Sequence, residues 1–202
     1  MLAVVVVSGH ARASLRVFVT KHLHPYKYDY RREWLRVVRT MDADSGQRSL
    51  ADRAVAALGQ LVDADLGGLW LLQDGQFVPV GGEMAGSLAR AQPADPQFVA
   101  ALCRSEWIID LHDARAGDGG TESLVVPAWL LEQKRARLVV PLLQETRLIG
   151  LLTLGGTLAE HALGWEDIDL LRAAGRQLSS YVALESAARK LSEAQQFEAY
   201  NR

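Results

Sequence analysis

The chain has 202 residues, of which 49% are hydrophobic, and its formal net charge is −2. That length allows one domain with a sizeable core plus flanking helix. Residues 1–39 contain eight Lys/Arg against two acidic residues, whereas the remainder contains fourteen basic and twenty-two acidic residues. An acidic main body argues against a nucleic-acid partner, which needs clustered basic side chains. The two parts of the chain are expected to face different surroundings.

Cys103 is the only cysteine, so the chain can form no internal disulfide and no multi-thiolate metal site. A reducing compartment fits this composition. Residues 2–7 form an aliphatic run far shorter than the roughly 20 residues that cross a bilayer. Two interpretations of this run stay open: a buried strand, or the end of a membrane span with basic residues on its cytoplasmic flank.

The first predicted helix begins near Tyr28, in "YDYRREWLRVVRTMD". One of its faces is apolar, at the spacing i, i+3, i+4 and i+7, and carries Trp34, Val37, Val38 and Met41. The opposite face is basic. Residues 42–47 are rich in turn formers and end the helix.

A second helix is predicted from Ser49, a candidate N-cap with Asp52 three residues later. Its apolar residues repeat at helical spacing and are Ala51, Ala54, Val55, Leu58, Leu61 and Val62. Two apolar runs then flank Asp74 and Gly75, a dipeptide that suits the positive φ angles of a tight turn. This pattern predicts a β-hairpin.

The middle of the chain predicts short elements. Residues 81–97 are rich in Gly, Pro and Ala, which indicates an irregular connection. A short helix follows, opened by Asp95 with Pro96 in its first turn. The next segments predict, in order, a strand in "WIIDLHDA" at 107–114, a loop at 115–123 and a short helix at 127–136.

The stretch "LVVPLLQETRLIGLLTLG", residues 138–155, predicts a second hairpin. Pro141 lacks a ladder donor and belongs at a sheet edge or an irregularity, and Gly150 weakens its strand unless something packs closely there. The last helix begins near Trp165. It has one apolar stripe of Ile168, Leu171, Leu178 and Val182, and a second of Leu170, Ala174, Tyr181, Leu184, Ala188 and Leu191. Two stripes predict two partners, and a heptad-like seam that leaves its domain predicts pairing with a second copy.

This order of elements resembles that of a GAF domain. The segment "VVPLLQETRLIGLLTLGG" is similar to the late hairpin of that family, and "LGWEDIDLLRAAGRQLSSYVAL" is similar to its closing helix. The resemblance covers residues 49–185. It implies an α+β fold with a central antiparallel sheet of five or six strands, helices on one face, and long N- and C-terminal helices. The family's cyclic-nucleotide pattern, Asn-Lys-Phe-Asp-Glu, is absent from the sequence.

Two flanking segments resemble a sensor histidine kinase of exosortase/PEP-CTERM systems. The segment "VFVTKHLHPYKYDYRREWLRVVRTM" is similar to the linker after the kinase's membrane segments, and "QFEAYNR" is similar to the helix entering its dimerisation and phosphoacceptor region. The resemblance implies three parts: a basic juxtamembrane segment with a linker helix at 1–47, a GAF sensory domain at 48–185, and a signalling helix at 186–202.

The same resemblance implies a place in the cell and a set of partners. It implies a homodimer on the cytoplasmic side of the bacterial inner membrane, with the membrane and a kinase domain in the parent protein and a response regulator downstream. A phosphoacceptor histidine motif and nucleotide-binding glycine boxes are absent from these 202 residues. We therefore expect no enzymatic activity from this part of a kinase.

Candidate cofactor ligands are sparse. Cys103 is followed by Arg104 rather than by the histidine of a chromophore-bearing Cys-His pair, which favours a small buried hydrophobe. His112 has only Asp110 and Asp113 nearby, and on a strand these two carboxylates point to different faces. We therefore expect no metal, haem or bilin, and the sequence does not identify a ligand.

A ligand cavity is expected between the sheet face that carries Trp70 and the segment from Trp107 to Leu131, under a Gly-rich flap at 112–128. Such sites are mostly apolar with a few polar anchors. The candidate ligand-binding residues are Trp70, Trp107, His112, Trp129, Arg137 and Thr153. The alternative stays open that Trp107 and Trp129 fill this space as core side chains.

The leading hypothesis is a sensory module that binds a small ligand and transmits a signal by changing the packing of dimeric helices. The candidate dimer contacts are Leu184, Ala188 and Leu191, with Trp34, Val37 and Met41 as the other candidate surface. The rival hypothesis is a ligand-free dimerisation spacer between membrane and kinase. A third hypothesis is a free-standing enzyme, such as the methionine sulfoxide reductases of the GAF fold. Those enzymes need several cysteines, and the single cysteine of this chain argues against that function.

Overall fold

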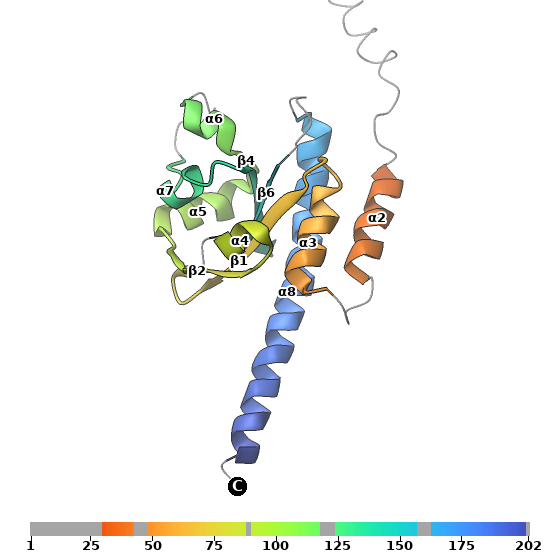
Figure 1. Cartoon of the computed structure of the whole chain (residues 1–202), viewed down its shortest axis with the longest axis vertical. Helices are drawn as coiled ribbons and strands as arrows, with labels where there is room; N and C mark the ends of the chain where they lie inside the picture. The colour runs from red at the N-terminus through yellow and green to blue at the C-terminus, as the bar shows by residue number, and fades with distance from the viewer. Residues whose placement is uncertain (1–29, 43–47, 88–89, 118–123, 157–162, 201–202) are drawn as a thin grey trace, which may run out of the picture. The chain divides into compact units, whose positions relative to one another are not determined.

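The computed structural model describes residues 30–42, 48–87, 90–117, 124–156 and 163–200 (Figure 1). The chain divides into two compact units, residues 1–33 and 34–202. The packing described below belongs to the second unit. Most of the predicted juxtamembrane segment and the middle of the predicted flap, residues 118–123, lie outside the described residues.

The centre of the domain is one antiparallel sheet of six strands in the order β3-β2-β1-β6-β5-β4. The strands are β1 (Leu66–Gln73), β2 (Gln76–Gly81), β3 (Gln92–Pro93), β4 (Ile109–Asp110), β5 (Ala136–Gln144) and β6 (Arg147–Gly155). Both "GLWLL" and "LIGLLTLG" lie in this sheet. The prediction of an antiparallel sheet with five or six strands is confirmed.

Local rules of strand pairing explain the two hairpins. Asp74 and Gly75 have φ angles of 48° and 74°, the positive values of a two-residue hairpin turn. β4 pairs only with Leu138 and Val139, so at Pro141 one side of β5 has no strand partner among the described residues. A Cβ on Gly150 would lie well within 3.0 Å of the main-chain oxygen of Trp70. Close packing of β1 against β6 therefore requires glycine at this position.

Two helices cover one face of the sheet, α3 (Leu50–Gly59) and α8 (Trp165–Tyr200), and α2 (Tyr30–Asp42) lies outside them, on the side away from the sheet (Figure 1). The Ser49 hydroxyl accepts a hydrogen bond from the Asp52 amide at 3.1 Å, which confirms the predicted N-cap of α3. The core side chains of these helices form one cluster with strand residues at alternate positions, including Leu69, Val140, Leu152 and Leu154. The predicted placement of the helices from Ser49 and Trp165 on one face is confirmed.

Four short helices lie over the opposite face: α4 (Glu83–Ser87), α5 (Pro96–Ser105), α6 (Leu111–Ala116) and α7 (Ala128–Leu131). The Asp95 carboxylate accepts a hydrogen bond from the Gln97 amide at 2.7 Å and caps α5 as predicted. The side chains of this second core come from the remaining strand positions and include Trp70, Phe77, Val139 and Leu151. The sheet is thus buried on both faces.

Two predictions for the middle of the chain are wrong. In "WIIDLHDA" only residues 109–110 form a strand, and α6 begins at Leu111 because the Asp110 carboxylate accepts a hydrogen bond from the His112 amide at 2.8 Å. That N-cap redirects an apolar run into a helix. The stretch 81–97, expected to be irregular, contains α4 and β3.

α8 has 36 residues, a rise of about 54 Å at 1.5 Å per residue. Among the α8 residues whose burial is described, the last buried one is Val182, and Leu184 and Leu191 beyond it are 72% and 62% exposed. The early part of the predicted second stripe, Leu170 and Ala174, is buried in the core shared with α2 and α3. Leu170 and Ala174 therefore pack within their own chain, and only the later residues of the stripe, such as Leu184 and Leu191, are exposed to a second copy. None of the helices among the described residues combines the length and apolar character that a bilayer crossing requires.

Candidate functional site

Aromatic rings pack together on the sheet face that carries Trp70. The ring centroids of Trp70 and Trp129 lie 4.9 Å apart at an interplanar angle of 57°, and Phe77 lies 5.8 Å from Trp129. Trp70 and Phe77 are fully buried, and Trp129 is 8% exposed. Trp70 and Trp129, both predicted to bind a ligand, are therefore brought together, but mainly as core. Only Trp129 also reaches a concave surface.

That surface is a groove of about 420 Å³ between the start of α4 and the turn that joins α7 to β5. Its lining residues come from two stretches of the chain that are distant in the sequence and are Glu83, Met84, Trp129, Glu132, Gln133, Lys134 and Arg135. The volume lies within the range of small-molecule sites. We name this feature the α4–α7 groove, and it is the candidate functional site.

The groove surface carries an ion pair, and two of its lining residues also have buried polar atoms without partners among the described residues. The Arg135 guanidinium lies 2.8 Å from the Glu83 carboxylate, and both side chains are about two-thirds exposed. The indole nitrogen of Trp129 and both polar atoms of the Gln133 amide are buried without a hydrogen-bond partner among the described residues. A buried polar group without a partner costs about 1–3 kcal/mol. These three atoms are enclosed by the protein, so they belong to the interior behind the groove and are not part of its exposed surface.

The turn that carries Gln133 is fixed by one arginine from α6. Arg115 donates from Nε to the oxygen of Leu131 at 2.9 Å, and from Nη2 to the oxygens of Gln133 and Ala136 at 2.8 and 3.0 Å. These three bonds hold the main chain on both sides of the Gln133 side chain. Arg115 is therefore a positioning residue, which pre-organises one wall of the groove.

Thr153 supports the groove from beneath. It is fully buried, and its hydroxyl lies 3.3 Å from the Gly68 oxygen and 3.8 Å from the sulfur of Met84. Thr153 was predicted as a ligand anchor, but its hydrogen bond is made within the sheet. Its link to the groove runs through Met84.

The other predicted ligand residues do not line the groove. Arg137 pairs with Asp110 at 3.4 Å on the neighbouring strands. His112 lies on α6, its side chain is 78% exposed, and its nearest carboxylate is Asp113 at 3.3 Å. Trp107 is 38% exposed and lines a separate depression of about 150 Å³. The correction for His112 follows from the helix that replaced the predicted strand, because the start of a helix at Leu111 turns its side chain outward to solvent.

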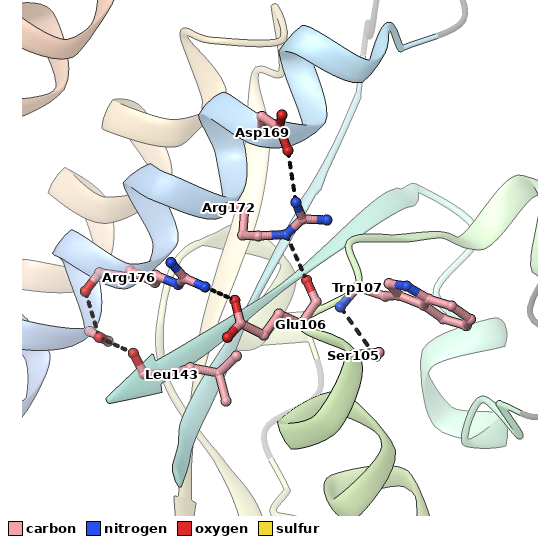
Figure 2. A network of polar contacts seen from close by, with 8 residues as sticks. Ser105, Glu106, Trp107, Leu143, Asp169, Arg172 and Arg176 are labelled. Atoms are coloured by element: carbon pink, nitrogen blue, oxygen red, sulfur yellow. Dashed lines mark hydrogen bonds and ion pairs between the residues drawn. The ribbon is translucent and has the colours of Figure 1, made fainter. Parts of the chain in front are cut away.

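A second polar cluster joins α5 to α8 (Figure 2). Glu106 ends α5 in the left-handed conformation at φ 52°. Its main-chain oxygen accepts a hydrogen bond from Arg172 Nε at 3.3 Å, and its carboxylate pairs with Arg176. Figure 2 shows both arginines converging on Glu106, while the indole of Trp107 points away from them. Arg172 also pairs with Asp169 at 2.7 Å. We call this the Glu106 junction.

The predicted dimer residues fall into two groups. Val37 and Met41 are each 1% exposed and pack in their own chain's core, and the Met41 oxygen accepts a hydrogen bond from Arg53. They are therefore core residues rather than a surface for a second subunit, and Trp34 on the same helix is half-buried. In contrast, Leu184, Ala188 and Leu191 are all exposed.

Sequence reasoning missed Glu83, Gln133 and Arg135 at the groove, and Glu106 at the junction. None of these residues belongs to a local motif, because the contacts join segments that are distant in the sequence. Cys103, expected to be buried, is half-buried. Among the described residues, no three His, Cys, Asp or Glu side chains gather in a way that could hold a metal ion.

The GAF domain family model matches residues 45–183. The chain belongs to the GAF domain family, a general sensory and signalling module. No curated protein matches the chain.

Solved GAF domains share this fold at low sequence identity. The GAF domain of a phosphoenolpyruvate-protein phosphotransferase (ptsP) from Coxiella burnetii is 16% identical over 80% of this chain and 96% of that one, with a TM-score of 0.58. The corresponding domain from Acinetobacter is 15% identical over 77% and 95%, with a TM-score of 0.53. A GAF domain/HD domain protein from Geobacter sulfurreducens is 15% identical over 69% and 95%, with a TM-score of 0.50.

Proposed function

We propose that this GAF domain is the sensory module of a two-component sensor histidine kinase, on the cytoplasmic side of the bacterial inner membrane. In this proposal a small ligand binds in the α4–α7 groove, and the signal leaves the domain along α8 in a homodimer. The link to a kinase, and to exosortase/PEP-CTERM systems in particular, is supported by the similarity of the two flanking segments. Phosphoryl transfer to a response regulator belongs to the kinase domain of the parent protein.

One observation carries the ligand-binding role: the α4–α7 groove has a volume of about 420 Å³, within the range of small-molecule sites, and its lining combines the indole-bearing Trp129 with the Glu83–Arg135 ion pair. The clamp formed by Arg115 supports the same interpretation, because it holds the main chain of one groove wall in a defined place through the oxygens of Leu131, Gln133 and Ala136.

The relay is supported by the position of the Glu106 junction. α5 packs beside the aromatic cluster through Phe98, whose ring lies 6.5 Å from Phe77, and Phe77 lies 5.8 Å from Trp129 in the groove wall. The other end of α5 is tied to α8 through Glu106. A shift of Trp129 therefore has a packed route to α8 around the sheet.

The alternative function is a ligand-free dimerisation spacer, and the filling of the predicted cavity by indole rings favours it. A thermal-shift screen of small metabolites separates the two functions. A ligand at 100 times its dissociation constant stabilises the fold by about 2.7 kcal/mol, and Gln133→Leu should abolish the shift while the exposed Gln97→Leu keeps it. A screen without hits, together with a more stable Gln133→Leu variant, would establish the spacer.

A further inference from the structure

α8 leaves the domain next to the end of α2. Val182 is the last buried residue of α8 among those whose burial is described, and Leu184, two positions later, is 72% exposed. The hydroxyl of Tyr181, immediately before Val182, donates a hydrogen bond at 3.1 Å to the carboxylate of Asp42, the last residue of α2. The turn of α8 that leads into its exposed part is therefore tied to α2.

Arg53 of α3 joins the same two helices. Its Nη1 donates to the main-chain oxygen of Met41 at 2.5 Å, and its Nη2 lies 3.9 Å from the Glu185 carboxylate. The Arg53 side chain is only 12% exposed, and its Nε has no hydrogen-bond partner among the described residues. An enclosed guanidinium is costly unless its acceptors stay in place. The position of Arg53 therefore depends on both helices, which couples α2 to α8.

α2 is held in place by few buried side chains. Val37 and Met41 are fully buried, and the other described side chains of α2 are half-buried or exposed. A helix of 13 residues is marginally stable on its own in water, so its formation depends on this docked stripe. Because α2 lies outside α3 and α8, its release leaves the sheet covered (Figure 1). α2 can therefore come away while the rest of the domain stays folded.

We propose that α2 is a detachable latch on α8. The docked helix fixes the turn at residues 181–185, and its release frees that turn. The latch is a second input to α8, which acts through the chain before α2 and does not depend on a ligand in the α4–α7 groove. Coupling between two sites is reciprocal. Release of α2 therefore loosens α8, and loosening the turn of α8 also loosens α2.

Hydrogen exchange of the full 202-residue chain, followed by mass spectrometry, tests the latch. Val37→Ser removes a buried side chain from the docked stripe, whereas Leu35→Ser places the same residue at a position of α2 that is 46% exposed. We expect Val37→Ser to raise exchange at least tenfold in α2 and in residues 181–191, with exchange in β1 and β6 unchanged. Leu35→Ser is the matched control and should leave exchange in α8 as in the parent chain.

Tyr181→Phe tests the coupling from the other end. It removes only the hydroxyl that bonds to Asp42 and leaves the docked stripe of α2 intact. By reciprocity we expect at least twofold faster exchange in α2 as well as in the turn of α8. Added to Val37→Ser, it should change α8 no further, because release of α2 has already broken that bond. Ser180→Ala, at an exposed position of the same turn, is the control and should not raise exchange in α2.

Two results with Val37→Ser would overturn the latch. One is faster exchange in α2 while α8 stays as in the parent chain. The other is an equal rise in α8 for Leu35→Ser, since docking would then not be the cause. If Val37→Ser also raises exchange in the sheet, the domain has unfolded as a whole and Tyr181→Phe decides. Unchanged exchange of α2 in that variant would then overturn the proposal, whereas an empty metabolite screen would affect only the ligand-binding role.

Discussion

The main-chain oxygen of Glu106 accepts a hydrogen bond from Nε of Arg172 at 3.3 Å, which fastens the end of α5 to α8. A main-chain acceptor of this kind survives any substitution at Glu106 itself, whereas the carboxylate contact with Arg176 does not. The junction therefore has two separable parts. The bond to Arg172 depends on the conformation of the main chain at Glu106, and the ion pair with Arg176 depends on the Glu106 side chain.

Glu106→Gln tests the side-chain part. The substitution keeps the shape but removes the charge, so we expect a loss of only about 0.5–1 kcal/mol of unfolding free energy, as for other partly exposed ion pairs. Hydrogen exchange should nevertheless rise in α8 around Arg176, because the helix loses one of its ties to α5. Equal exchange in parent and variant would show that the ion pair does not restrain α8.

The exposed seam of α8 predicts a dimer. Replacing Leu184 and Leu191 together with Asp places two charges in a surface that a second copy would bury, which costs several kcal/mol of association free energy. We expect monomers by light scattering with the domain still folded, since both side chains are exposed in the single chain. Ser192→Asp, also exposed on α8, is the control and should stay dimeric. A double variant that stays dimeric would place the interface elsewhere.

Two glycines predict opposite responses to alanine. At Gly150 a methyl group would collide with the main chain of Trp70, so Gly150→Ala should cost about 1–3 kcal/mol, as overpacking does. At Gly86, on α4, a Cβ would meet nothing within 4 Å. Gly86→Ala should therefore stabilise the fold by about 0.4–1 kcal/mol through the unfolded state. Urea unfolding of the two variants gives both values, and the same sign for both would contradict the packing described at Gly150.

The raised pKa of Tyr181 predicts that the free energy of unfolding changes with pH in the alkaline range. Partial burial, and then the hydrogen bond from its hydroxyl to Asp42 at 3.1 Å, raise the pKa of this tyrosine above its ordinary value of 10.0. The folded state therefore keeps this proton when the unfolded state has lost it. The stabilisation is complete below pH 10 and falls as the pH rises through the folded-state pKa. Melting temperatures of the parent and of Tyr181→Phe should converge over this range, and a constant difference would exclude the linkage.

The hairpins and the caps were predictable because their causes are local. Asp74 and Gly75 specify a turn, and Ser49 and Asp95 each cap a helix, whatever the rest of the chain does. The strand predicted after Trp107 was wrong beyond Asp110. The Asp110 carboxylate accepts a hydrogen bond from the His112 amide and starts a helix there, although the apolar run is typical of a strand. Caps inside apolar runs are weak signals, since the same aspartate also occurs at strand ends.

The groove and the junction were beyond prediction for a different reason. Glu83 and Arg135 lie 52 positions apart and Glu106 and Arg176 lie 70 apart, so their pairing depends on the strand order of the whole sheet. The left-handed cap at Glu106 also gave no signal, because glycine is the residue that usually marks such a position. The contact between Trp70 and Trp129 was also beyond prediction, because no sequence pattern specifies which indoles pack together.

The tilt between Trp70 and Trp129 gives this domain an optical property of its own. Two indoles with centroids 4.9 Å apart and planes inclined at 57° share their excited states, and a handed arrangement of coupled transition dipoles produces a circular dichroism couplet that isolated tryptophans lack. The sign and strength of the couplet depend on the angle between the rings. A rotation of α7 would therefore be visible as a change in ellipticity, in unlabelled protein and on the timescale of a stopped-flow experiment.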